Sequence, residues 1–276
     1  MTIDNFIPQV WSAATAQALL ETAVIAPICN RSYEGDAVRG NTVHITGVVP
    51  PTINDYKAAG RTTSAEDLND DGADLLINQE KAFDFHVDDV DRVQAAGSFD
   101  AWTTAAGRRL GEDADAYIAA QAIANGTASG LTAVPTTGDE THNVVRDLRK
   151  ALNKAKVPAG QRYLLMNPEF EALFLSADAK LTDADTSGTP AGLREATLGR
   201  YLGFTLVSSS QLPSVDTPQA IAFWQPALAY VSQINQTEAM RSHTKFADRI
   251  RGLHVYGAKV IDMYAAAVQV FSPTAV

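Results

Sequence analysis

Cysteine, long apolar runs and basic charge are all scarce in this sequence of 276 residues. The single cysteine, Cys29, excludes an intrachain disulfide and any zinc site built from several cysteines. No apolar stretch approaches the ~20 residues that a membrane-spanning helix needs. No charged segment followed by an apolar run opens the chain, so we expect neither a signal peptide nor a membrane partner.

Basic residues are outnumbered, with 22 Lys and Arg against 32 Asp and Glu and a formal net charge of −10. Such a surface repels nucleic acid by long-range electrostatics. Sequence-specific DNA binding is therefore not expected, although the protein can tolerate nucleic acid nearby.

Acidic residues gather between Glu66 and Asp91, a window with one base, Lys81. They include Asp84, Asp88, Asp89 and Asp91, which could serve as paired carboxylates for acid–base chemistry. Because they follow an alternating strand pattern, a charged outer face explains them better. Such a face can also recognise a basic surface on a neighbouring subunit. The candidate basic partners are Arg108, Arg109, Arg194 and Arg200.

One segment resembles a calcium-binding loop. "DLNDDGADLLIN", residues 67–78, places Asp67, Asn69, Asp71 and Gly72 as in the first half of an EF-hand. Asn78 stands where the bidentate glutamate is required. A solvated acidic turn is therefore the preferred interpretation, and we predict no metal site.

Catalytic motifs are also missing. The five histidines are His44, His86, His142, His243 and His254, and no pair has the zinc-protease spacing. The nucleophile elbow, the phosphate-binding loop and the dinucleotide-binding glycine motif are absent. Cys29 lacks an obvious base and is read as a packed small hydrophobe. We predict no catalytic or cofactor-binding residues, and no enzyme.

Periodicity predicts the elements of the first half. Residues 8–25 have the apolar stripe of a helix that ends at Pro27. Residues 40–49 and 73–87 alternate like two strands of a ribbon, with a polar loop between them. We read 36–91 as one long two-stranded excursion, which should lie on a neighbour because an isolated ribbon is marginal in water. Residues 98–125 form the clearest helix, stopped by a left-handed Gly126.

The second half alternates helices and strands. Residues 142–156 and 169–176 are predicted helices, and 177–192 is a polar loop. The predicted strands are 162–168, the end of 198–213, 220–224, 250–261 and 265–271.

Three stretches resemble the major capsid proteins of tailed bacteriophages, whose fold is shared with encapsulins. "FIPQVWSAATAQALLETAVI" followed by "GNTVHI" is similar to the family's arm and the start of its extended loop. "ATLGRYLGFTLVSSSQLP", residues 196–213, is similar to its axial lobe, and "DRIRGLHVYGAKVI", residues 248–261, to its closing strand. The three stretches occur in the family's order and at fitting distances.

The resemblance implies an α+β phage major-capsid-type fold. It would comprise an N-terminal arm (1–35), a long extended β-hairpin loop (36–91), a peripheral domain (92–126 and 250–276) with a long spine helix (98–125), and an α/β axial domain (127–249). Lys57 lies in the loop region where some members crosslink, but no motif match transfers that chemistry.

The implied function is self-assembly into an icosahedral shell of pentamers and hexamers around non-specifically held double-stranded DNA. Scaffolding, portal and decoration proteins would be further partners, and the virion, assembled in the host cytoplasm, the location. An encapsulin-like compartment and a soluble α/β enzyme with a dispersed site are the alternatives.

His254 and Tyr256 then have a mechanical role. On a strand they face the side opposite to Leu253 and Val255 and fill the sheet's interior, whereas Gly252 and Gly257 allow bulges or a close backbone approach.

Overall fold

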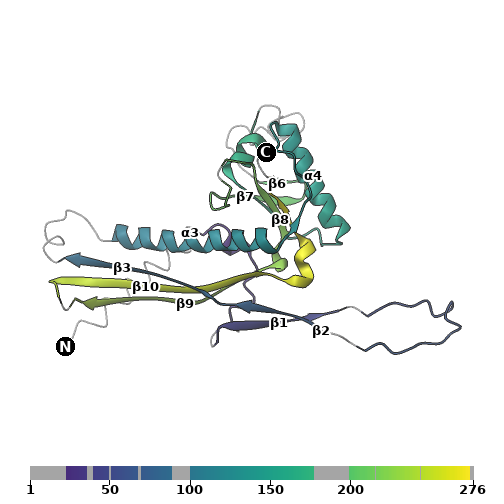
Figure 1. Ribbon diagram of the computed structural model, residues 1–276, viewed down its shortest axis with the longest axis horizontal. Helices are drawn as coiled ribbons and strands as arrows, with labels where there is room; N and C mark the ends of the chain where they lie inside the picture. Colours follow the sequence, from purple (N-terminus) through teal and green to yellow (C-terminus); the bar gives the residue numbers. More distant parts are fainter. Residues whose placement is uncertain are drawn as a thin grey trace.

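The computed structural model describes residues 23–35, 40–49, 51–67, 70–88, 100–176, 199–214, 216–242 and 244–273. Figure 1 shows a long helix lying along an elongated sheet, a compact lobe at one end of this layer, and a hairpin that extends beyond it. Helices and strands thus form the predicted α+β arrangement.

The elongated sheet has the strand order β3-β10-β9 and is antiparallel throughout. Its strands are β3 (Gln79–Asp88), β10 (Ala247–Val260) and β9 (Leu228–Arg241). Helix α3 (Asp100–Asn125) lies along one face of this sheet and confirms the helix predicted over 98–125. Its inward stripe of Leu110, Ala114, Ile118 and Ala122 is buried, as the spacing requires.

The lobe contains a six-stranded sheet in the order β4-β11-β8-β5-β7-β6. Alternate residues of its strands face two different cores. Leu164, Ala220 and Phe271 pack under the helices, while Leu165 and Ile221 pack in the core that holds α3. The elements are β4 (Thr127–Ala128), α4 (Gly138–Lys154), β5 (Arg162–Met166), α5 (Pro168–Phe174), β6 (Arg200–Tyr201), β7 (Phe204–Ser208), β8 (Ala220–Trp224) and β11 (Val268–Phe271).

The hairpin pairs β1 (Thr42–Val48) with β2 (Asp70–Leu76), antiparallel. The expected two-stranded excursion over 36–91 is therefore wrong in its second half, because β3 leaves the ribbon and joins β10. The apolar alternation is interrupted after Ile77 by the polar residues 78–81 and resumes at Phe83, but this interruption does not indicate which strand the later residues join. The break is set by packing, since the backbone at Leu76 and Ile77 closes over Gly257 of β10.

The end of the chain also differs from the expectation. β9 was not predicted as a strand. It pairs antiparallel with β10 and therefore belongs to the elongated sheet rather than to the lobe. The last strand begins at Val268 rather than at residue 265, after the 3₁₀ helix η4 (Asp262–Ala267), and it joins the lobe's sheet beside β8. The division into four domains stays a prediction.

Two helix ends need correction. The predicted helix over 8–25 lies mostly outside the described residues, and Ala23, Val24 and Ile25 are not helical; a short 3₁₀ turn, η2 (Ala26–Ile28), follows. Gly126 is not left-handed. A Cβ there would lie 2.5 Å from the Ala122 carbonyl oxygen, so close packing selects the glycine.

Candidate assembly surfaces

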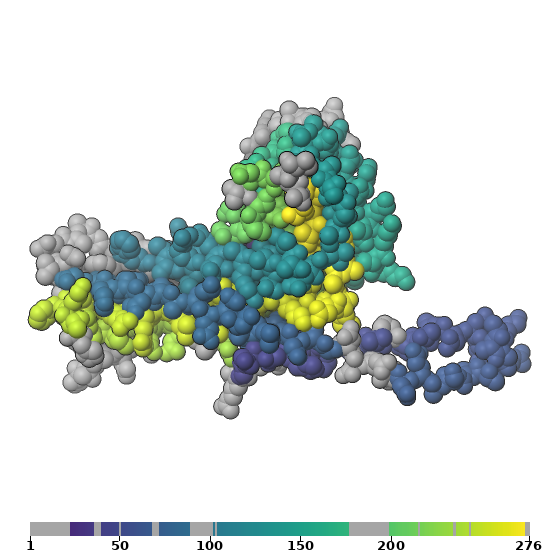
Figure 2. Space-filling model, viewed as in Figure 1, coloured from purple at the N-terminus to yellow at the C-terminus, as the bar shows by residue number. Residues whose placement is uncertain are grey.

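The tip of the hairpin is exposed throughout residues 51–67 and stands clear of the body (Figure 2). Its apolar side chains are in water: Ile53 is 96% exposed. The tip is nevertheless shaped by its own contacts. The Asp55 carboxylate accepts hydrogen bonds from the backbone N–H groups of Lys57 and Ala58, and the Thr52 N–H donates to Glu66 at 2.9 Å. A preformed, solvated tip with apolar groups is suited to contact another molecule.

The base of the hairpin is different, because it packs on its own chain. Val43, Ile45 and Leu75 are buried against Val231 and Val255. Figure 1 shows the hairpin base on the side of the elongated sheet that lies opposite α3. The expectation that all of 36–91 must pack on a neighbour is therefore too broad. Only the tip, residues 51–67, lacks packing against its own chain's described residues.

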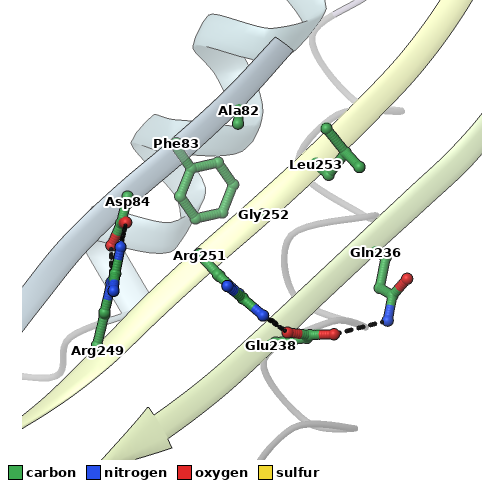
Figure 3. A pocket seen from close by; sticks show the side chains of 9 residues that line it. All are labelled: Ala82, Phe83, Asp84, Gln236, Glu238, Arg249, Arg251, Gly252 and Leu253. Carbon is green, nitrogen blue, oxygen red and sulfur yellow. Dashed lines mark hydrogen bonds and ion pairs between the residues drawn. The ribbon is translucent and has the colours of Figure 1, made fainter. Parts of the chain in front are cut away.

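The same open face continues beyond the hairpin as a groove of about 280 Å³ (Figure 3). Two ion pairs line it: Arg249 binds Asp84 through both carboxylate oxygens, and Arg251 binds Glu238. The Arg249 hydrogen bond holds the pKa of Asp84 below its usual value. Each arginine is neutralised by the carboxylate that it binds, so this groove has little net charge.

The acidic residues of the predicted outer face are only partly described. Asp84 lies on β3 with Arg249 as its partner, Asp88 lies at the end of β3, and Asp89 and Asp91 lie outside the described residues. The predicted basic partners are dispersed. Arg108 and Arg109 are exposed on α3, where Arg109 pairs with Glu112 at 3.1 Å. Arg200 is exposed on β6, and Arg194 lies outside the described residues.

The calcium-loop pattern does not form a loop. Asp71 and Gly72 lie within β2, opposite Gly47 and Thr46. Asn78 instead accepts a hydrogen bond from the Tyr117 hydroxyl at 3.0 Å. Asp67 is exposed, and Asn69 lies outside the described residues. Within the described part of the chain, no group of three metal-binding side chains converges.

The histidines are scattered. His44 faces Asp74 across the hairpin, His86 is exposed on β3, and His142 bonds the Tyr201 hydroxyl. His243 lies outside the described residues. His254 is fully buried, and its Nε2 lies 3.1 Å from the Ser232 hydroxyl. Each described histidine has a separate environment, so they do not form one site.

Tyr256 packs beneath α3, and its hydroxyl donates to Asp113 at 2.5 Å. Its ring lies edge-on to Tyr117 and 4.8 Å from the His254 ring, measured between centroids. Burial and the neighbouring Asp113 raise the pKa of Tyr256, which therefore stays protonated. Tyr256 fills the inner face of the sheet, as predicted, and its contacts with Asp113 and Tyr117 also join the sheet to α3.

Cys29 is buried, and its thiol donates to the Ile25 carbonyl oxygen at 3.3 Å. Burial raises the pKa of this thiol, so the reactive thiolate is disfavoured. Lys57 is exposed on the hairpin tip. Among the described residues, no helix is long and apolar enough to cross a membrane.

A buried carboxylate that the sequence analysis missed lies on α3. Asp115 is 2% exposed and accepts hydrogen bonds from the N–H groups of Val24, Ile25 and Ala26. Burial raises the pKa of Asp115, while these three bonds act in the opposite direction. Asp115 follows Ala114 directly and lies one turn before Ala119, two small apolar residues of the helix. This position was the one sign in the sequence that Asp115 faces the core.

Comparison with known proteins gives a consistent result. A family described as phage capsid protein matches residues 72–270. A solved structure from Mycobacterium phage Che8 is 48% identical, covers 91% of both chains and superposes with a TM-score of 0.83. The capsid of cyanophage P-SCSP1u, 15% identical, covers 86% of this chain and 85% of the other with a TM-score of 0.71.

A virus-like particle from Pyrococcus furiosus shares the fold. It is 13% identical, covers 97% of this chain and all of the other (100%), and has a TM-score of 0.63. No curated protein matches the sequence.

Proposed function

Because this chain belongs to the phage capsid protein family, it is a major capsid protein, and we propose that its copies close into an icosahedral shell of pentamers and hexamers. The observation that carries the proposal is the hairpin tip, whose apolar side chains have no cover within the chain's described part. A repeated contact between tip and neighbour would be one of several modest interfaces. Closed symmetry multiplies each such contact, so weak interfaces sum to a stable shell.

The neighbour that receives the tip is proposed to be a second copy of this chain. The tip, residues 51–67, carries two basic side chains, Lys57 and Arg61, against three acidic ones, Asp55, Glu66 and Asp67, so it is close to neutral, whereas the chain as a whole has a net charge of −10. A tip with so little net charge is only weakly repelled by the acidic surface of a sister subunit, so its exposed apolar side chains can pack there. The hairpin base holds the tip at a fixed distance from the body, because Leu75 and Ile77 are buried in their own chain.

Replacing residues 52–66 by a short glycine–serine turn tests the role of the tip. We expect a folded subunit with an unchanged melting temperature, because these side chains pack on nothing in the described chain, and a loss of shells in electron micrographs. The matched control is a glycine–serine segment of the original length, which keeps the reach and removes the side chains. Shells of normal size from the short-turn variant would show that the tip is dispensable.

The content of the shell is proposed to be double-stranded DNA, held without sequence recognition. The acidic surface supports weak, mobile contacts with such a polyanion. We further propose that scaffolding, portal and decoration proteins join the assembly in the host cytoplasm, and that the chain performs no catalysis. Nuclease-protected DNA in purified shells is expected. Shells that instead hold cargo enzymes would indicate an encapsulin-like compartment, which shares the fold.

A further inference from the structure

Asp115 is a charged residue in the interior of the long helix. It lies near the middle of α3 between Ala114 and Ala119, both fully or almost fully buried, and is itself 2% exposed. Moving a carboxylate out of water costs several kcal/mol unless hydrogen bonds replace its hydration. A buried charge at this position therefore requires a specific partner.

The partner is the backbone of a segment about 90 residues away. The N–H groups of Val24 and Ile25 donate to Asp115 Oδ2 at 2.7 and 3.0 Å, and that of Ala26 donates to Oδ1 at 3.0 Å. Hydrogen bonds to an ionised acceptor are about twice as strong as neutral ones. Three such bonds hold three consecutive residues, so they fix the path of the backbone there.

The same segment is held at a second point. The Asn30 N–H donates to the Leu228 carbonyl at 2.8 Å, and the Tyr230 N–H donates to the Asn30 carbonyl at 3.0 Å. Asn30 thus pairs with the edge of β9. Between the two points, the Ile25 side chain is fully buried in the core beside α3.

This geometry separates two functions. The pairing of Asn30 with β9 and the burial of Ile25 attach the segment to the body. The Asp115 carboxylate instead holds the backbone of residues 24–26, which lie within the predicted N-terminal arm (1–35). Residues 1–22 precede this point and have 2 acidic and 0 basic side chains.

We propose that Asp115 is the positioning residue of the predicted N-terminal arm: its carboxylate fixes the backbone of residues 24–26, so that the arm is attached to the body in the same way in every copy. This inference rests on the proposed self-assembly. A shell needs equivalent contacts from each subunit, and a variable exit would make those contacts unequal.

Amide hydrogen–deuterium exchange of the unassembled subunit tests the anchor by itself. In Asp115→Ala, we expect the amides of Val24, Ile25 and Ala26 to exchange at least about tenfold faster, with those of α4 and β5 unchanged. Asp115→Asn is the second variant and keeps the side chain's shape. The side-chain NH₂ group of the asparagine faces a backbone N–H, so at least one of the hydrogen bonds is lost while the amide oxygen can still accept. A smaller increase in the exchange rate of the same amides is therefore expected. Asp115→Asn also decides the test if Asp115→Ala does not fold.

Leu148→Ala is the matched control. Leu148 is fully buried in the lobe's other core, so its truncation lowers stability without touching the arm. We expect this variant to leave exchange at 24–26 unchanged and to yield shells of uniform size, whereas the Asp115 variants yield irregular or incomplete shells in electron micrographs.

Unchanged exchange at residues 24–26 in both Asp115 variants would overturn the anchor. Faster exchange with shells of wild-type uniformity would overturn the positioning role. Failure of the wild-type chain to form shells would instead count against the proposed function, and the exchange data would remain a separate measurement.

Discussion

His254 and Tyr256 act through packing and hydrogen bonding at the interface between sheet and helix. Tyr256 bonds Asp113 of α3, and His254 contacts Ser232 of β9. Nδ1 of His254 is buried and has no hydrogen-bond partner among the residues that the structure describes. A histidine in this position is stable in its neutral form, and its protonation costs free energy because burial disfavours the charged ring.

The subunit is therefore expected to lose stability in acid. Burial lowers the pKa of His254 from 6.5 to about 4, against a smaller opposing effect of Asp113. Between these values the unfolded chain binds a proton that the folded chain does not, so stability is complete above pH 6.5 and falls toward pH 4. The loss through this residue is about 3 kcal/mol.

Urea unfolding of the unassembled subunit at pH 7 and pH 4 measures this loss. His254→Gln removes the titrating group, and the difference in pH dependence between the two proteins isolates it from the carboxylates. Equal pH dependence in both proteins would show that His254 does not titrate as inferred.

Gly257 is required where two backbones meet. A Cβ at this position would lie 2.3 Å from the Leu76 carbonyl oxygen, which cannot move without shifting the hairpin. We expect Gly257→Ala to lower the free energy of unfolding by about 2–3 kcal/mol. Gly252→Ala should cost less, because the atoms in its way belong to the Phe83 ring. Gly160→Ala has open space and is the control; thermal denaturation ranks the three.

The hairpin and the helices show how single elements are fixed. The hairpin has a packed base and a solvated tip, so its position and its contacts are determined by different residues. Helix α4 has an apolar face that includes Val145, Leu148 and Leu152, and an N-terminal cap at Thr137. It begins at Gly138, before the predicted residue 142, because this cap satisfies the first backbone N–H groups.

Thr137→Ala is expected to destabilise the lobe by about 1 kcal/mol. The Thr137 hydroxyl accepts a hydrogen bond from the Glu140 N–H at 3.3 Å, and alanine leaves that donor without its partner. Thr137→Ser keeps the hydroxyl and should have close to wild-type stability. Chemical denaturation followed by circular dichroism compares the three proteins; equal stability of all of them would exclude the cap.

At the scale of the whole molecule, the shape of the subunit favours assembly and its net charge opposes it. The elongated layer, the projecting hairpin and the lobe offer contacts at several places (Figure 1). Each copy nevertheless has a net charge of −10, so copies repel one another at long range. Assembly therefore depends on short-range contacts that exceed a repulsion which salt can screen.

Raising the ionic strength is expected to lower the subunit concentration at which shells form. The Debye length falls from about 30 Å at 0.01 M to about 10 Å at 0.1 M, which shortens the range of the repulsion. Light scattering of purified subunits at the two salt concentrations measures this threshold, with sucrose of equal osmolarity as the control. A threshold that rises with salt would show that attraction between opposite charges of neighbouring copies dominates instead.

The sequence by itself determined the elements whose pattern is local. The spacing of Leu110, Ala114 and Ile118 predicts α3, and the apolar run at 220–224 predicts β8, because each pattern repeats within one element. The polar loop between the two strands of the hairpin was likewise predicted from its composition. These features need no information about distant residues.

Only the tertiary structure decided which elements pair. The break after Ile77, the strand β9 and the contact of Asp115 with residues 24–26 depend on groups far apart in the sequence. Alternation looks the same whichever sheet a strand joins, and a buried aspartate looks like a surface one until its partner is placed. The physical reason is that hydrogen bonding and close packing are satisfied in space, where residues separated by about 90 positions lie within 3 Å.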